Sequence, residues 1–280
     1  INNPLLHMDK VICTPHLRAA TEDAQANVTR QAATQVLDFL QRGVVNNALN
    51  VPSVNADQLK TLWPYLNLAE RLGSFLAQLL KKPFSSISIE YAGSIINHPT
   101  EPMSMAALKG LLTSIIGSRV NYVNARHIID KRGIEVTETR TNVTNGYSNT
   151  LTLRIQGDEG TQSVSGALFL NSECRIIRVD GYQVENIPEG TILVVNNLDK
   201  PGVLALIGRV LEETGINVAM MNLSRRENSG KAVSLLTVDQ SIPDTVMEQL
   251  RQDPRIISAR QVTLPPMADE LHPLSTDTLK

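Results

Sequence analysis

Hydrophobic and polar positions at the start of the chain predict a short strand followed by a long helix. Residues 10–14 are mostly apolar and end at Pro15, which forces the residue before it into an extended conformation. Apolar residues then recur at helical spacing from Ala24 to Leu40. Thr21 can cap this helix, and the two acidic residues that follow it complement the positive end of the helix dipole.

A second pattern begins near Asp57, where apolar residues again follow helical spacing as far as Leu79. The dipeptide Asn145-Gly146 is a hairpin signal and predicts that the strands on either side of it pair. The pattern after Leu79 predicts a strand at 87–91, a helix at 103–117, a strand at 120–123, a helix at 125–132 and strands at 133–141, 149–156, 162–170 and 174–180.

The last third of the chain alternates strands and helices in a regular order. It predicts strands at 191–197, 216–224, 231–238 and 255–264, with helices at 199–214 and 244–252. The order βαββαβ predicts an antiparallel sheet with two helices on one face. Residues 265–280 are polar and contain proline, which is typical of a disordered tail.

Composition excludes several classes of protein. A net charge of −2 and a pI near 6.3 give no electrostatic footprint for nucleic acid. Apolar stretches are shorter than the ~20 residues of a membrane span. Cys13 and Cys174 are far apart and form no CxxC motif, so we expect no disulfide scaffold, no metal site and a cytoplasmic location. The chain begins at Ile1 without Met, from which we expect a piece of a longer protein.

The most informative motif is the run Val11–Leu17, in which a strand delivers a proline and then His16. From the residues alone, His16 is either a packed or surface histidine after a strand, or a general acid–base group. The second interpretation suits an imidazole, whose ordinary pKa is roughly 6.5.

This run, together with Gln31–Leu40, Val44–Asn50 and Leu68–Leu79, resembles the long-form D-3-phosphoglycerate dehydrogenases of the D-2-hydroxyacid dehydrogenase family. The resemblance extends to about residue 264. It implies NAD-dependent oxidation of 3-phosphoglycerate to 3-phosphohydroxypyruvate, the first step of L-serine biosynthesis.

The resemblance also assigns roles near the N-terminus. His16 would be the catalytic proton acceptor, and His16, Leu17, Arg18 and Ala19 would lie at the NAD site. The family's paired glutamate, substrate-binding arginine and glycine-rich loop precede the matching stretch, so we expect this chain alone to be inactive. The family has His-Leu-Gly where this chain has His-Leu-Arg, so Arg18 either points to solvent or reshapes the nicotinamide pocket.

Residues 196–203 and 215–218 resemble an ACT domain, an amino-acid-sensing module. From the residues alone, Asp199 predicts a helix cap, followed by proline and glycine. The resemblance adds a ligand: Asn197, Asp199 and Asn217 would bind L-serine across a dimer of ACT domains. It therefore implies feedback regulation and a homo-oligomer, with a tetramer expected from the family.

The middle unit resembles the intervening domain of the same dehydrogenases. Its basic residues are either solvated surface or the site of an anionic effector such as a phosphorylated substrate. The candidates are Arg119, His127, Lys131, Arg132, Arg175 and Arg178.

The expected fold class is α/β and α+β. The expected division is a C-terminal remnant of the nucleotide- and substrate-binding unit at 1–53, an α+β intervening (allosteric substrate-binding-like) domain at 54–188, a ferredoxin-like ACT domain at 189–264 and a disordered tail at 265–280. Three alternatives are a different NAD-dependent 2-hydroxyacid dehydrogenase, a free-standing amino-acid-binding ACT module and a serine dehydratase subunit. The last requires a cysteine-bound iron–sulfur cluster, which two distant cysteines do not form.

Overall fold

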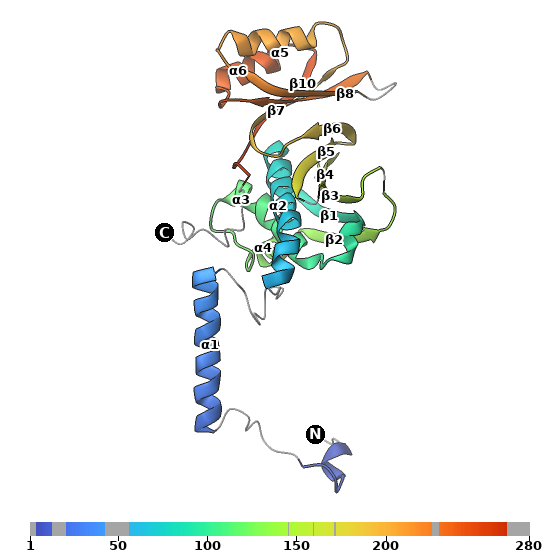
Figure 1. Cartoon of the computed structure of the whole chain (residues 1–280). Coiled ribbons are helices and arrows are strands. Elements are labelled where there is room, and N and C mark those ends of the chain that lie inside the picture. Colours follow the sequence, from blue (N-terminus) through green and yellow to red (C-terminus); the bar gives the residue numbers. More distant parts are fainter. Residues whose placement is uncertain are drawn as a thin grey trace. The chain divides into compact units, whose positions relative to one another are not determined.

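The computed structural model describes residues 4–12, 21–42, 56–144, 146–158, 160–170, 172–225 and 230–267 (Figure 1). The chain divides into two units, one containing Ile1–Ala48 and the other Asp57–Leu271.

The described part of the first unit consists of a short 3-10 helix, η1 (Pro4–His7), and helix α1 (Glu22–Arg42). The side-chain hydroxyl of Thr21 accepts a hydrogen bond from the backbone N–H of Ala24 at 3.2 Å, so the predicted cap is confirmed. Apolar side chains of α1, such as Val28, remain exposed. Residues 10–12, the described part of the strand predicted at 10–14, do not belong to a sheet, and Ile12 is 91% exposed.

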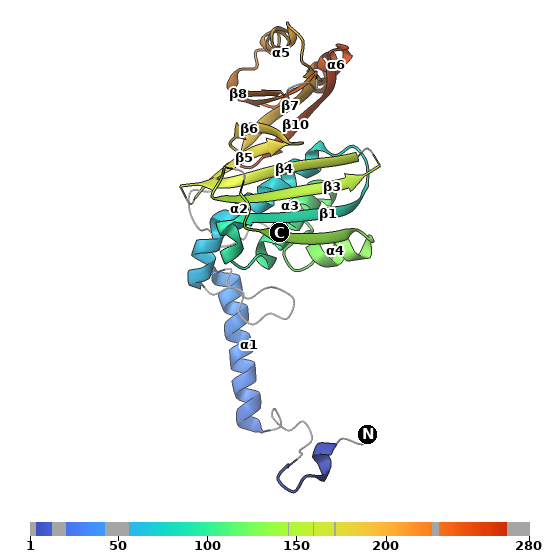
Figure 2. The same ribbon diagram turned by 90° about the vertical axis from the view of Figure 1, so that its right-hand side faces the viewer.

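The second unit begins with a mixed sheet covered by helices on one face (Figure 2). Within the described residues its strand order is β2-β1-β3-β4-β5-β6, and β2 is parallel to β1 while the other neighbours are antiparallel. The elements are α2 (Ala56–Leu79), β1 (Phe84–Gly93), η2 (Ser94–Asn97), α3 (Glu101–Ile116), α4 (Ala125–Lys131), β2 (Glu135–Thr141), β3 (Asn149–Gly157), β4 (Gly160–Phe169), β5 (Glu173–Val179) and β6 (Tyr182–Asn186).

Two sequence predictions for this part are wrong, and one strand was missed. β2 and β3 do not form a hairpin, because β1 lies between them in the sheet. The stretch 120–123 is a turn, in which the Asn121 side-chain oxygen accepts hydrogen bonds from the N–H groups of Val123 and Asn124 at 2.9 Å. Such local side-chain bonds compete with strand pairing. The short strand β6 was not predicted.

The core of this part lies between the sheet and helices α2 and α3. Alternate residues of β3 are buried toward the helices, while Thr150, Thr152 and Arg154 face the other way. The two helices approach to backbone contact: a Cβ atom on Gly73 would lie 2.1 Å from the carbonyl oxygen of Ala107. Only glycine permits this approach.

The C-terminal part has the predicted βαββαβ order, which is therefore confirmed. Its strands have the order β10-β7-β9-β8 with antiparallel neighbours, and both helices lie on one face (Figure 1). The elements are β7 (Gly190–Leu198), α5 (Val203–Glu212), β8 (Val218–Arg225), β9 (Lys231–Val238), α6 (Asp244–Gln252) and β10 (Ile256–Leu264).

Helix α5 begins at Val203, four residues later than predicted, so Asp199 is not its cap. Gly202 has a φ of 88° in the left-handed region, which ends the preceding turn and prevents the helix from extending back. The helix then packs into a core that includes Leu193, Ile207 and Leu250.

Candidate functional site

The residues predicted to serve catalysis and NAD binding, His16, Leu17, Arg18 and Ala19, lie outside the described residues. Among the residues that the structure does describe, no helix is long and apolar enough to cross a membrane. The same residues contain no cluster of three or more histidine, cysteine or acidic side chains placed to hold a metal ion.

The three predicted effector residues have different environments. Asn197 lies near the end of β7 and is only 3% exposed; its side-chain N–H donates to the carbonyl of Leu198 at 2.7 Å. Its side-chain oxygen is buried and accepts no hydrogen bond within the described residues. Asp199 is exposed just beyond β7, and exposed Asn217 donates to the carboxylate of Asp239 at 2.8 Å.

The sheet register places Asn217 at the opposite end from the other two. Both β7 and β8 pair with β9, and Val238 lies opposite Thr191 on one side and Val218 on the other. At the other end of β9, Leu198 of β7 lies opposite Lys231 and Arg225 of β8 lies opposite Ala232. At ~3.4 Å per strand residue, Asn217 is more than about 20 Å from Asp199 within one chain.

Arg225, the last residue of β8, lies beside Asp199 and was not predicted. One guanidinium nitrogen is 3.7 Å from the Asp199 carboxylate, and the Arg225 side chain is 73% exposed. β8 is also an edge strand of its sheet, with exposed apolar side chains at Met220, Met221 and Leu223. An arginine in a charged, polar stretch is typical of solvated surface, so no local sequence pattern distinguishes Arg225 as a binding residue.

A second candidate site is a hollow on the face of the first sheet that α2 and α3 leave uncovered. Its volume is about 300 Å³. Arg154 donates to the carboxylate of Glu90 at 2.6 Å, and the hydroxyls of Thr152 and Ser165 bond each other at 2.8 Å. The lining is mostly hydroxyls and charges, from Glu90, Ala92, Val143, Thr150, Thr152, Arg154, Thr161, Ser163, Ser165, Arg178, Asp180 and Gly181.

Only one of the six predicted basic residues, Arg178, lines this hollow. Arg175 instead pairs with Glu173 at 2.8 Å on the same strand. The remaining four, Arg119, His127, Lys131 and Arg132, are exposed around α4. Arg154 was missed, although its alternation with two threonines in β3 placed it on the polar face of the strand.

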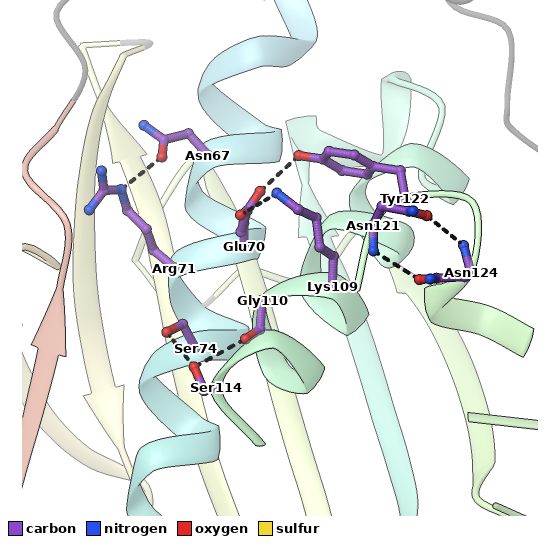
Figure 3. A network of polar contacts seen from close by, with 10 residues as sticks. All are labelled: Asn67, Glu70, Arg71, Ser74, Lys109, Gly110, Ser114, Asn121, Tyr122 and Asn124. Atoms are coloured by element: carbon purple, nitrogen blue, oxygen red, sulfur yellow. Dashed lines mark hydrogen bonds and ion pairs between the residues drawn. The ribbon is translucent and has the colours of Figure 1, made fainter. Parts of the chain in front are cut away.

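A polar network on the other face joins α2 to α3 (Figure 3). The Glu70 carboxylate accepts hydrogen bonds from Lys109 at 2.6 Å and from Tyr122 at 2.8 Å. The Lys109 ammonium also lies 4.6 Å from the centre of the Tyr122 ring. Burial, together with the negative charge of Glu70, raises the pKa of Tyr122 well above its ordinary value. These groups satisfy one another's hydrogen bonds, so the network has a structural role and fixes α2 against α3.

Comparison with known proteins identifies two domains. Residues 61–180 match the D-3-phosphoglycerate dehydrogenase intervening domain, and residues 191–255 match the ACT domain.

The chain is similar to several proteins named D-3-phosphoglycerate dehydrogenase. That of Bacillus subtilis is 32% identical over 95% of this chain and 50% of the relative. The Methanocaldococcus jannaschii protein is 35% identical over 94% of the chain and 50% of the relative. The Synechocystis protein is 35% identical over 93% of the chain and 47% of the relative. The chain thus spans about half the length of these relatives. By its intervening domain, its ACT domain and these relatives, the chain belongs to the D-3-phosphoglycerate dehydrogenase family.

Proposed function

We propose that this chain is part of an NAD-dependent D-3-phosphoglycerate dehydrogenase that is regulated by L-serine at its ACT domain. The names of the relatives and the two matched domains support this proposal. In it, His16 accepts the proton of the 2-hydroxyl group as hydride leaves for NAD, and Leu17, Arg18 and Ala19 lie beside the nicotinamide. These four roles rest on sequence position alone.

The observation that carries the regulatory proposal is the position of β8 at a sheet edge, with Asn217 and Arg225 at its two ends. If β8 pairs antiparallel with β8 of a second copy, the two strands run in opposite directions. Asn217 of the second copy then comes next to Arg225 and Asp199 of the first. The effector site therefore forms only in a dimer, with two equivalent sites related by twofold symmetry.

The charges at this end of the sheet suit an amino acid zwitterion. The Asp199 carboxylate binds the ammonium group, and the exposed Arg225 guanidinium binds the carboxylate through a charge-assisted fork. Asn217 of the second copy binds the serine hydroxyl, since an amide can both donate and accept. Asn197, which is buried, sets the turn behind the ligand through its bond to the Leu198 carbonyl.

Calorimetric titration of L-serine tests this arrangement. We expect saturable binding to the chain and loss of binding in Asp199→Ala and in Asn217→Ala, with Arg126→Ala on remote α4 as the unaffected control. Co-expression of the two binding-deficient variants is the sharper experiment. A mixed dimer keeps one site with both side chains intact, so binding should return at one site per mixed dimer.

The two titrations distinguish a serine site shared by two chains from a site within one chain and from no serine site. Return of binding in the mixed dimer supports a site shared by two copies. Binding by the wild-type chain without any return in mixed dimers would mean that the site lies within one chain. No serine binding by folded protein would refute the effector assignment.

The catalytic half of the proposal has its own test. In the protein expressed with its complete reading frame, His16→Ala should abolish NADH formation from 3-phosphoglycerate, whereas Arg126→Ala should leave it unchanged. Unchanged turnover in the histidine variant would refute the role of His16.

We also propose that the hollow on the first sheet binds a phosphorylated anion. Its volume, its hydroxyl groups and the arginines at 154 and 178 support this role. The Glu90 carboxylate orients Arg154, and the carboxylates of Glu90 and Asp180 limit the net charge of the hollow. Titration with 3-phosphoglycerate, followed by NMR shifts of Thr152 and Ser165, should show saturable binding that is lost in Arg178→Ala and kept in Arg132→Ala. Equal shifts in both variants would contradict the assignment.

A further inference from the structure

The structure contains a buried arginine that none of the proposed sites uses. Arg71 lies on α2 and is only 5% exposed. Its guanidinium donates to the side-chain oxygen of Asn67 at 2.7 Å and to the carbonyls of Pro188 at 2.8 Å, Pro265 at 2.7 Å and Pro266 at 2.8 Å. Pro188 directly precedes the ACT domain and the other two prolines directly follow it. A single side chain of the intervening domain thus holds both connections to the ACT domain.

Only arginine can make this set of bonds. A guanidinium carries five N–H donors in a rigid plane, whereas a lysine ammonium is a point charge with three. Burial is the main influence on Arg71 and lowers the pKa of its guanidinium from the ordinary value. A buried charge is tolerated only when its hydrogen-bonding groups are satisfied, and here backbone carbonyls satisfy them. The first residues of the predicted disordered tail supply two of these carbonyls.

Further bonds hold the end of the last ACT strand against α2 and join the two connections to each other. The Gln78 side-chain amide accepts from the N–H of Thr263 at 2.9 Å and donates to its carbonyl at 3.0 Å. Glu189, in the entering connection, accepts a hydrogen bond from the N–H of Met267 at 2.9 Å. Arg71 and Gln78 are separated by about two helical turns, so the exit from the ACT domain is held at two points along α2.

The helix that carries Arg71 is fixed to its neighbour. Next to Arg71, Glu70 points to the other side of α2 and accepts bonds from Lys109 and Tyr122 (Figure 3). A Cβ on Gly110 of α3 would lie 1.9 Å from the carbonyl oxygen of Glu70, so the two helix backbones are in contact. Because such packed contacts do not deform smoothly, we expect α2 and α3 to move as one body.

We propose that Arg71 is a latch that fixes the orientation of the ACT domain on the intervening domain. A rotation of the ACT domain pulls both connections against the guanidinium, and the force passes through α2 to α3. Breaking the latch leaves both domains folded but frees their relative orientation. This inference depends neither on the substrate nor on the effector proposed above.

A distance measurement between the two domains tests the latch. Spin labels on Lys131→Cys of α4 and Glu248→Cys of α6, both exposed positions, report the distance between the domains by double electron–electron resonance. Cys13→Ser removes one native thiol, and Cys174 is buried. We expect one narrow distance distribution in this background.

Arg71→Met should broaden that distribution and create a second thermal unfolding step. Arg71→Lys should give an intermediate width, because lysine cannot reach all the carbonyls. Arg126→Met, which removes an exposed arginine of α4, should leave the narrow distribution unchanged.

Two further variants keep the proposal testable if Arg71→Met does not fold. Ending the chain after Leu264 removes two acceptors while keeping Arg71, and Gln78→Leu removes the neighbouring tie. Either variant should also broaden the distribution of distances between the two spin labels. A narrow distribution in a folded Arg71→Met protein, or a broad one in the unaltered chain, would overturn the latch.

Discussion

Replacing Gly110 by alanine is expected to destabilise the protein, although alanine usually stabilises a helix. Gly110 lies within α3, and the substitution adds one methyl group. That methyl would lie 1.9 Å from the carbonyl oxygen of Glu70 and 2.8 Å from its carbonyl carbon. Both atoms belong to the backbone of α2, so no side-chain rotation can relieve the contact, and the two helices must separate.

The magnitude follows from two opposing contributions. Alanine is favoured over glycine in a helix interior by about 1 kcal/mol. Overpacking a tight contact costs about 1–3 kcal/mol, and a clash with rigid backbone belongs at or above the upper end of that range. The expected net loss in the free energy of unfolding is therefore roughly 2 kcal/mol. For 150–250 residues that unfold together, the corresponding fall in Tm is roughly 4–8 °C.

Gly208→Ala is the matched control. Gly208 also lies within a helix, α5, but an added Cβ has open space around it, with no heavy atom within 4 Å. Only the helix preference acts there, so the variant should be more stable by about 1 kcal/mol. Urea unfolding followed by far-UV circular dichroism measures both. Equal effects of the two substitutions, or a gain of stability in Gly110→Ala, would refute the argument from backbone contact.

Three other results are expected. Burial raises the pKa of the Cys174 thiol to about 11, so mass spectrometry should find this residue alkylated only after unfolding. Hydrogen bonds from Arg255 lower the pKa of Asp253 to about 2, and their contribution to stability is present above the ordinary value near 4 and lost as pH falls toward 2. An NMR titration of the carboxyl carbon should show that midpoint, and a midpoint near 4 would mean that the pair does not form in solution. Leu250→Ala empties a fully buried position of the ACT core and should cost about 2–5 kcal/mol in chemical denaturation, whereas a loss below 1 kcal/mol would mean that the core closes over the gap.

The candidate sites were only partly predictable from the sequence. Asp199 and Asn217 came from a resemblance, and the residues gave no sign that they lie at opposite ends of one sheet. The arginines at 71, 154 and 225 were missed because each looks like an ordinary polar position in its own segment. Their importance depends on groups far away in the chain: Arg71 meets carbonyls 117 to 195 residues away.

The sequence by itself determined most of the local elements and the βαββαβ order of the ACT domain, because hydrophobic periodicity and turn residues act over a few neighbouring positions. Only the tertiary structure decided that β1 separates β2 from β3, that Gly110 must be glycine, and that Asn217 and Asp199 lie at opposite ends of one sheet. It also placed Arg71 between the two ends of the ACT domain. These outcomes follow from pairing and packing between segments distant in the chain, and no local pattern records which distant segment will be the partner.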